Sequence, residues 1–227
     1  KSMDNQDRNP VEERRFPHPY NPCKFTLDRI RQEVIKFSKD ISSDATVLDF
    51  GCGAKPYQYF IDGKAKEYIG LDIDESPDRN PGVDEIIAPG EKIPYADGYF
   101  DAIICTQVFE HLKDPEFYGA EFGRVLKSGG IAFVSSAFAW EYHPYPKDYW
   151  RITEDGYRII FKDFSEILFE VDTNSLQTII QSLNFLMDHR QIKFRLPYYF
   201  VNFVVSKLNY KKGDRNFPGN LFVYLRK

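Results

Sequence analysis

Short apolar runs alternate with amphipathic stretches along most of the chain. Residues 25–40 predict a helix, because their apolar side chains recur every three or four positions: Leu27, Ile30, Val34 and Phe37. Seven apolar runs predict strands: 45–50, 67–73, 84–89, 99–108, 131–138, 164–171 and 220–227. The run at 99–108 is almost continuously apolar, as is typical of a buried parallel strand.

Helix signals stand between several of these runs. Asp114 is a candidate N-cap, Pro115 fits a first helical turn, and Gly129-Gly130 is expected to end that helix after Lys127. Thr153 is a second candidate N-cap. Strands that alternate with helices predict an α/β fold: a doubly wound, mostly parallel seven-stranded sheet.

Two segments do not belong to this alternation. Residues 1–22 are polar, charged and rich in proline, so we expect a flexible N-terminal arm ahead of a single domain at 23–227. Residues 175–217 are more than a short connection needs and carry helical spacing, so we expect a helical insertion before the last strand.

Composition narrows the class of protein. The 227 residues carry a net charge of −4, which does not favour nucleic acid as the main partner. The three cysteines, Cys23, Cys52 and Cys105, are unevenly spaced and fit a reducing compartment better than a disulfide framework. No apolar run is long enough to cross a bilayer and no signal peptide is evident, so we expect a cytoplasmic protein.

The first strand leads into two glycines one residue apart, in VLDFGCGAKPY. The pattern fits a dinucleotide fingerprint, another nucleoside-cofactor loop or a plain tight turn. A dinucleotide loop reads G-x-G-x-x-G, and Pro56 stands where its third glycine belongs. The fingerprint is therefore incomplete for NAD, and the other two interpretations remain.

The order of motifs resembles the class I S-adenosylmethionine (SAM)-dependent methyltransferases, in particular the type 11 group. VLDFGCG, YIGLDID, YADGYFDAIICTQVFEHLKDP and RVLKSGG are similar to successive motifs of that group. The resemblance implies SAM as cofactor and a methyltransferase enzyme. It implies a cofactor site at Asp49, Gly51, Cys52, Gly53, Asp72, Ile73, Gly90, Glu91 and Gln107, with Asp72 on the ribose hydroxyls.

The chain departs from the resemblance at two points. Pro89 stands where relatives often carry the acid that binds adenine, so either backbone near Gly90 and Glu91 or another side chain takes that role. Some relatives bind magnesium through E-x-x-E-H, whereas TQVFEHL has Gln107 at the first acidic position. Glu110 and His111 alone offer too few oxygen ligands for magnesium, so we predict no catalytic metal.

The aromatic segment AWEYHPYPKDYWRIT follows the fifth strand, at the edge where open α/β sheets bind substrates. Similar segments occur in methyltransferases associated with bacterial surface glycans, which implies a sugar-like acceptor. Alternatively, Tyr149 and Trp150 only anchor the next helix. A hydroxyl acceptor requires a base, and we predict His143, oriented by Asp148, with His111 as the second candidate.

The leading functional interpretation is methyl transfer from SAM to an oxygen, or less favourably a nitrogen, of a small molecule or glycan intermediate. One alternative is an RNA methyltransferase that uses the basic residues of 189–215: Arg190, Lys193, Arg195, Lys207, Lys211, Lys212 and Arg215. Another is a catalytically inactive SAM-binding protein. A homodimer through the insertion is also possible, and the sequence does not name the acceptor.

Overall fold

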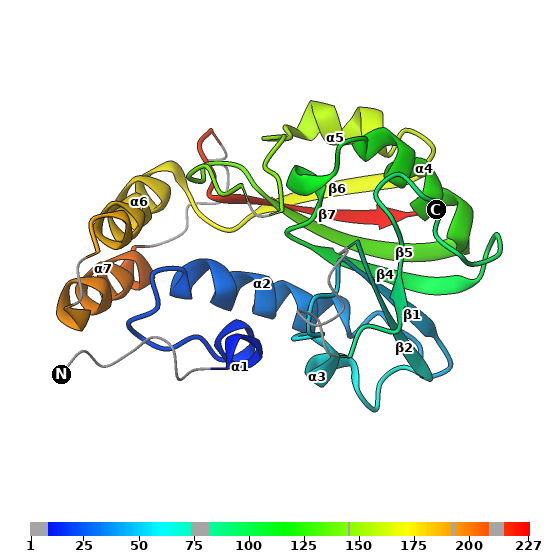
Figure 1. Ribbon diagram of the computed structural model, residues 1–227, viewed down its shortest axis with the longest axis horizontal. Coiled ribbons are helices and arrows are strands. Elements are labelled where there is room, and N and C mark those ends of the chain that lie inside the picture. The colour runs from blue at the N-terminus through cyan, green and yellow to red at the C-terminus, as the bar shows by residue number, and fades with distance from the viewer. Residues whose placement is uncertain (1–8, 74–81, 145, 192–193, 209–215) are drawn as a thin grey trace.

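A seven-stranded sheet runs through the computed structural model, which describes residues 9–73, 82–144, 146–191, 194–208 and 216–227 (Figure 1). The strands are β1 (Thr46–Phe50), β2 (Glu67–Asp72), β3 (Glu85–Ile86), β4 (Phe100–Thr106), β5 (Leu126–Ala137), β6 (Glu166–Val171) and β7 (Asn220–Arg226). Their order in space is β3-β2-β1-β4-β5-β7-β6. The first five of that order are parallel, and β7 is antiparallel to both its neighbours. The predicted α/β fold is confirmed.

Helices cover both faces of this sheet. They are α1 (Pro10–Arg15), α2 (Lys24–Phe37), α3 (Gln58–Ile61), the 3-10 turn η3 (Phe109–His111), α4 (Pro115–Val125), α5 (Glu154–Ile160), α6 (Ser175–His189) and α7 (Arg195–Lys207). Figure 1 shows α4 and α5 on one face of the sheet and α1, α2 and α3 on the other. Successive strand residues point to opposite faces, so Val47 packs in the cluster that contains α2 residues, while Leu48 packs in the cluster that contains α4 and α5 residues.

The helix predicted after Asp114 ends earlier than the sequence indicated. The Asp114 side chain caps it by accepting from Phe117 N at 2.9 Å, as expected. The helix nevertheless ends at Val125, and Gly129-Gly130 lie inside β5 instead of closing the helix. This part of β5 pairs with Lys227, whose N donates to Gly130 O at 3.0 Å.

The N-terminal segment differs from the flexible arm we expected. Residues 1–8 lie outside the described residues, but Asn9 caps α1 by accepting from Val11 N. Arg15 Nε donates to Pro56 O at 2.8 Å and thereby ties α1 to the glycine loop. Residues 9–22 thus pack on the domain through contacts that hydrophobic periodicity does not reveal.

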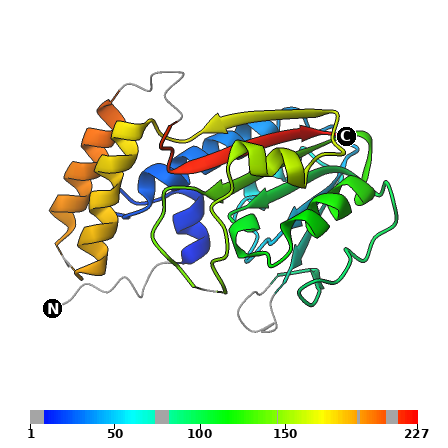
Figure 2. The same cartoon turned by 90° about the horizontal axis from the view of Figure 1, so that it is seen from above.

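The insertion forms a pair of helices at one end of the molecule (Figure 2). The face of α6 that packs inward is polar: Gln181 Nε2 donates to Pro22 O at 2.6 Å, and Asn184 Nδ2 donates to Asn202 Oδ1 at 2.9 Å. Four of its apolar side chains are exposed instead, namely Leu176, Ile179, Leu183 and Leu186. Among the described residues, no helix has both the length and the apolar character that crossing a bilayer requires.

Candidate functional site

The candidate site lies where β1 and β4 end. From β1 the chain builds outward to β2 and β3, and it then returns to place β4 on the other side of β1. Such a reversal of strand order opens a crevice outside the carboxyl ends of the strands, where ligands of open α/β sheets bind. The predicted glycine loop follows β1, and the segment with Gln107, Glu110 and His111 follows β4.

The glycine loop has a backbone that ordinary side chains disfavour. Gly51 has φ +70° and Gly53 has φ +51°. A Cβ atom on Gly51 would lie 2.3 Å from Val108 Cγ2, whereas one on Gly53 would meet none of the described residues within 4 Å. Gly51 is therefore needed to pack the loop on the segment after β4, while at Gly53 the described residues leave space that a ligand can enter.

Asp72 lies directly beside this loop. Gly53 N donates to Asp72 Oδ2 at 2.8 Å, and Ile73 N donates to Asp72 Oδ1 at 2.7 Å. The predicted residues of β1 and β2 are thus brought together, because the two strands are parallel neighbours that end at the same edge. Ile73 itself packs against the hydrophobic core.

Asp49 lies beneath the loop and is 1% exposed. It accepts a hydrogen bond from Tyr68 Oη at 2.5 Å. Burial raises the pKa of Asp49 to about 7, although the Tyr68 hydrogen bond opposes that shift. Burial likewise raises the pKa of the neighbouring Cys52 thiol, which disfavours its reactive thiolate form. A contact between Cys52 and the cofactor stays a prediction.

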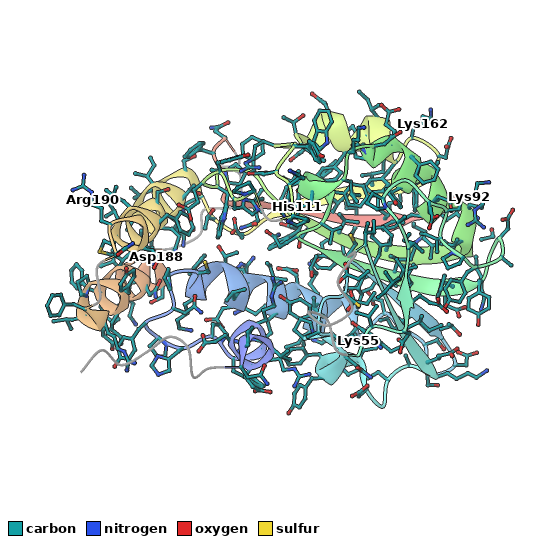
Figure 3. The ribbon with its side chains drawn as sticks, in the orientation of Figure 1. Lys55, Lys92, His111, Lys162, Asp188 and Arg190 are labelled. Carbon is teal, nitrogen blue, oxygen red and sulfur yellow. The ribbon has the colours of Figure 1, made fainter. Side chains whose placement is uncertain are left out.

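Lys55 is a site residue that sequence reasoning missed. Its side chain, labelled in Figure 3, crosses β2. It forms an ion pair with Asp84, whose Oδ2 also accepts from Gly70 N at 2.7 Å. A Cβ atom on Gly70 would lie 2.2 Å from Lys55 Cε, which explains a glycine inside a strand. No periodic pattern points to this lysine, because its partner belongs to the segment before β3.

Gly90 and Glu91 lie in the loop that follows β3. Gly90 N donates to Tyr118 Oη at 2.9 Å, and the Glu91 carboxylate accepts from Ala88 N at 2.9 Å. The first contact holds the loop on α4, and the second lies within the loop itself. An adenine contact by Gly90 or Glu91 stays a prediction.

Gln107, the first residue after β4, has φ +56°, which is uncommon for a residue with a side chain. Its backbone N donates to Ser135 O at 2.8 Å, and its Nε2 donates to Ser135 Oγ at 3.2 Å. The side chain is therefore held against β5. A direct role of Gln107 in cofactor binding stays a prediction.

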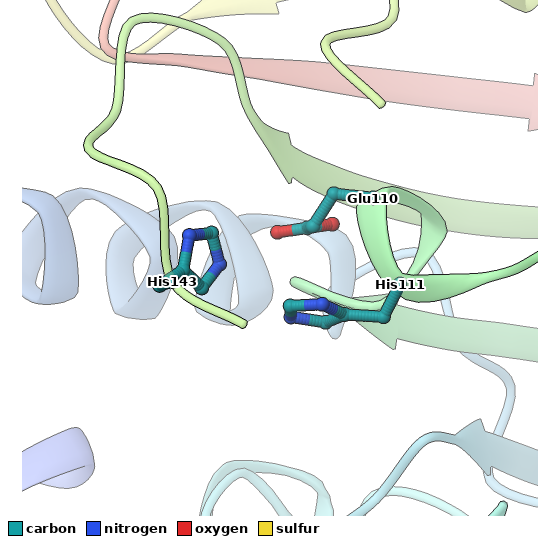
Figure 4. A group of neighbouring side chains, drawn as sticks. All are labelled: Glu110, His111 and His143. Atoms are coloured by element: carbon teal, nitrogen blue, oxygen red, sulfur yellow. The ribbon is translucent and has the colours of Figure 1, made fainter. Parts of the chain in front are cut away.

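Glu110, His111 and His143 form one cluster (Figure 4). One candidate ligand atom from each residue lies within 4.8 Å of the other two. Glu110 is 1% exposed; its Oε1 accepts from Ala137 N at 3.3 Å, while its Oε2 has no hydrogen-bond partner among the described residues. Burial raises the pKa of Glu110 to about 7 and lowers the pKa of His111. The two histidines predicted as catalytic candidates thus lie together, with an acid that was not predicted for that role.

Asp148 lies beside His143, as the base hypothesis requires. His143 Nδ1 lies 3.3 Å from Asp148 Oδ2 and 3.0 Å from Glu141 O. Arg151 holds the same carboxylate, with Nη2 donating to Asp148 Oδ2 at 2.8 Å, and this contact lowers the pKa of Asp148 to about 2. Asp148 is therefore a carboxylate at neutral pH.

The aromatic segment anchors its own loop through hydrogen bonds and also leaves two aromatic rings partly exposed to solvent. Trp150 Nε1 donates to Leu112 O at 2.8 Å, and Tyr149 N donates to Glu110 O at 2.8 Å. The side chains of Tyr149 and Trp150 nevertheless remain 48% and 44% exposed. Both interpretations made from the sequence are therefore compatible with the observed contacts.

The basic segment of the insertion is described in part. Arg190, Arg195 and Lys207 are exposed, and Arg190 lies at the end of α6 next to the acidic Asp188 (Figure 3). The other four basic residues lie outside the described residues: Lys193, Lys211, Lys212 and Arg215.

Comparisons with known proteins identify the central part of the chain. Residues 48–134 match a family described as a methyltransferase domain. The chain is 34% identical over 95 residues to an uncharacterized methyltransferase of Mycobacterium sp. (strain JLS), which covers 40% of this chain and 38% of that protein. It is 29% identical over 143 residues to a ubiquinone biosynthesis O-methyltransferase of Caulobacter vibrioides, covering 52% and 53% of the two chains. The match therefore spans between about two fifths and half the length of these relatives.

Solved structures share the fold across most of the chain. A SAM-dependent methyltransferase from Archaeoglobus fulgidus aligns with a TM-score of 0.58 at 17% identity, over 96% of this chain and 98% of that one. The [4+2]-cyclase SpnF aligns with a TM-score of 0.57 at 18% identity, over 88% and 81%. At these identities the likeness shows the fold alone. Together with the family match, it confirms the predicted resemblance.

Proposed function

We propose, from the premise that this chain carries a class I SAM-dependent methyltransferase domain, that it transfers a methyl group from SAM to an oxygen of a small molecule or glycan intermediate. A nitrogen acceptor is the less favoured form of the same proposal. The observation that carries it is the hydrogen bond from Gly53 N to Asp72 Oδ2 at 2.8 Å. This contact brings the glycine loop and the acid within reach of one nucleoside ligand.

The residues around the loop fit SAM as the methyl donor. The described residues leave space beside Gly53, and the Asp72 carboxylate at the end of β2 can accept hydrogen bonds from two ribose hydroxyls. Asp49 is buried at the end of β1, just before the loop, and Gly51 lets the loop pack against Val108. When bound, SAM supplies a methyl group that its sulfonium has already activated, so the chain chiefly has to position an acceptor in line with it.

The acceptor is proposed to lie between this loop and the aromatic segment. The exposed rings of Tyr149 and Trp150 suit the apolar face of a sugar or of another ring-containing molecule. His143, held by Asp148, is the proposed acceptor of the hydroxyl proton. The O-methyltransferase relative supports an oxygen acceptor, but only at 29% identity.

One experiment separates this proposal from its alternatives. The chain is incubated with methyl-labelled SAM and a fractionated cell extract, and the labelled fraction is identified. Label in small molecules or glycans supports the proposal, whereas label in RNA favours the exposed cations of the insertion as an RNA-binding surface. SAM binding without any labelled product would indicate an inactive binding protein or, since the fold also occurs in a cyclase, another reaction.

A homodimer through the insertion is a separate proposal about partners. It is supported by the apolar side chains that α6 and α7 expose together: Leu176, Ile179, Leu183, Leu186, Leu196, Tyr199, Phe200 and Phe203. In sedimentation velocity we expect the double variant Leu183→Lys, Phe200→Lys to be monomeric, while the control Ile159→Lys, on exposed α5, keeps the dimer. A wild-type chain that stays monomeric at high concentration would exclude the dimer.

A further inference from the structure

We propose that Glu110, His111 and His143 bind one divalent transition-metal ion of the zinc type. The proposal goes beyond the methyl transfer proposed above and does not depend on it, because it rests on the donor atoms themselves. The sequence predicted no metal from Glu110 and His111 alone. The fold adds a third donor from a loop that follows another strand.

The donors converge on one space. Glu110 and His111 belong to η3 after β4, and His143 belongs to the segment after β5. Their ligand atoms lie within 4.8 Å of one another, a spread that small side-chain rotations can close around one ion. Figure 4 shows the two imidazole rings and the carboxylate directed toward the same gap.

The hydrogen bonds on the far side of each ring assign the tautomer that a metal requires. His111 Nδ1 contacts Lys147 O, and His143 Nδ1 lies 3.0 Å from Glu141 O. A carbonyl oxygen only accepts, so each Nδ1 carries the proton and each Nε2 keeps its lone pair. Metal-binding histidines usually have this arrangement, with the second ring nitrogen donating to a carbonyl or carboxylate.

Glu110 supplies an independent observation. Its Oε2 is buried and without a hydrogen-bond partner among the described residues, in a side chain that is 1% exposed. An unsatisfied buried acceptor is destabilising, and a cation at this place would satisfy it. Arg151, a cation that acts on Glu110, is already paired with Asp148 and therefore competes less with a bound metal ion.

The donor types select the kind of cation. Two imidazoles and one carboxylate suit zinc and similar transition metals, whereas magnesium prefers oxygen ligands. Three protein ligands leave a fourth position open for water or an acceptor hydroxyl. With a metal bound, His143 Nε2 would be a ligand and would no longer accept a proton, and the metal would instead lower the pKa of a hydroxyl at its open position.

The test is isothermal titration of the metal-stripped full chain with zinc chloride. We expect one ion per chain and at least a tenfold loss of affinity in each of His111→Asn, His143→Asn and Glu110→Gln. His18→Asn, which removes a histidine outside the cluster, is the matched control and should bind like wild type. Circular dichroism establishes that each variant is folded, and Glu110→Gln keeps an oxygen that can accept from Ala137 N.

Cobalt substitution gives a second readout that does not depend on affinity. A cobalt-loaded chain should show visible absorption typical of nitrogen and oxygen ligands, and His143→Asn should change that spectrum. Absence of zinc binding, or binding that all three cluster variants retain, would overturn the proposal. SAM titrations of the same variants keep the two proposals apart, because loss of the metal site predicts unchanged SAM affinity.

Discussion

Asp49 should make the stability of the fold fall as pH rises. The carboxyl is 1% exposed, and its pKa is raised from 3.8 to about 7, mainly by burial. Between these two values the folded chain keeps a proton that the unfolded chain has released. The free energy of unfolding therefore decreases through this window, and the loss is complete above pH 7.

The size of the effect follows from the shift. One pKa unit corresponds to about 1.4 kcal/mol, so the two units between pH 5 and pH 7 are equivalent to about 3 kcal/mol. Asp49→Asn removes the charge and keeps an oxygen that can accept from Tyr68 Oη. Any cost of the buried amide is independent of pH. The free energy of unfolding of the variant, minus that of wild type, should therefore increase by about 3 kcal/mol from pH 5 to pH 8.

Urea unfolding at both pH values, followed by tryptophan fluorescence, measures this difference. Other groups titrate equally in both proteins, so the wild-type and variant comparison isolates Asp49. Asp40→Asn, at an exposed position, controls for the loss of one negative charge. A stability difference between Asp49→Asn and wild type that is the same at pH 5 and pH 8 would refute the reasoning.

Three further predictions concern the site. Asp72→Ala removes a charged hydrogen-bond acceptor that contributes about 1.5–3 kcal/mol, so SAM affinity measured by calorimetry should fall about tenfold or more. Unchanged SAM affinity in a folded variant would contradict the assignment of Asp72 to the ribose. Gly51→Ala should destabilise the fold by about 1–3 kcal/mol in urea unfolding, because alanine would adopt φ +70° and its Cβ would lie 2.3 Å from Val108. A variant as stable as wild type would show that the loop relaxes easily. His143→Asn should lower turnover roughly 10²–10⁴-fold while SAM affinity, measured in parallel, is retained; near-normal turnover on the true acceptor would exclude His143 as the base.

The sequence by itself determined the central part of the fold and the position of the glycine loop. Strand runs, glycines and caps are local signals, because burial and backbone conformation act on neighbouring residues. Asp49, Gly51, Gly53 and Asp72 could be named in advance, since they end two parallel strands that are adjacent in space and close in sequence.

Only the tertiary structure decided the features that depend on contacts between residues far apart in the sequence. α4 ends at Val125 because the next residue, Leu126, pairs with Phe100 of β4. The position of the Lys55 side chain depends on its ion pair with Asp84, which lies across β2. The polar face of α6 is buried because backbone carbonyls of the N-terminal segment, such as Pro22 O, accept its hydrogen bonds.

The cluster of Glu110, His111 and His143 also could not be predicted from the sequence. Glu110 and His111 are adjacent in sequence, but His143 reaches them only because β4 and β5 are parallel neighbours whose following segments meet at one edge. The path of the second segment is set by long-range contacts, including the bond from Trp150 Nε1 to Leu112 O. Spacing along a chain does not encode such a loop path, so the three donors become one site only in the folded protein.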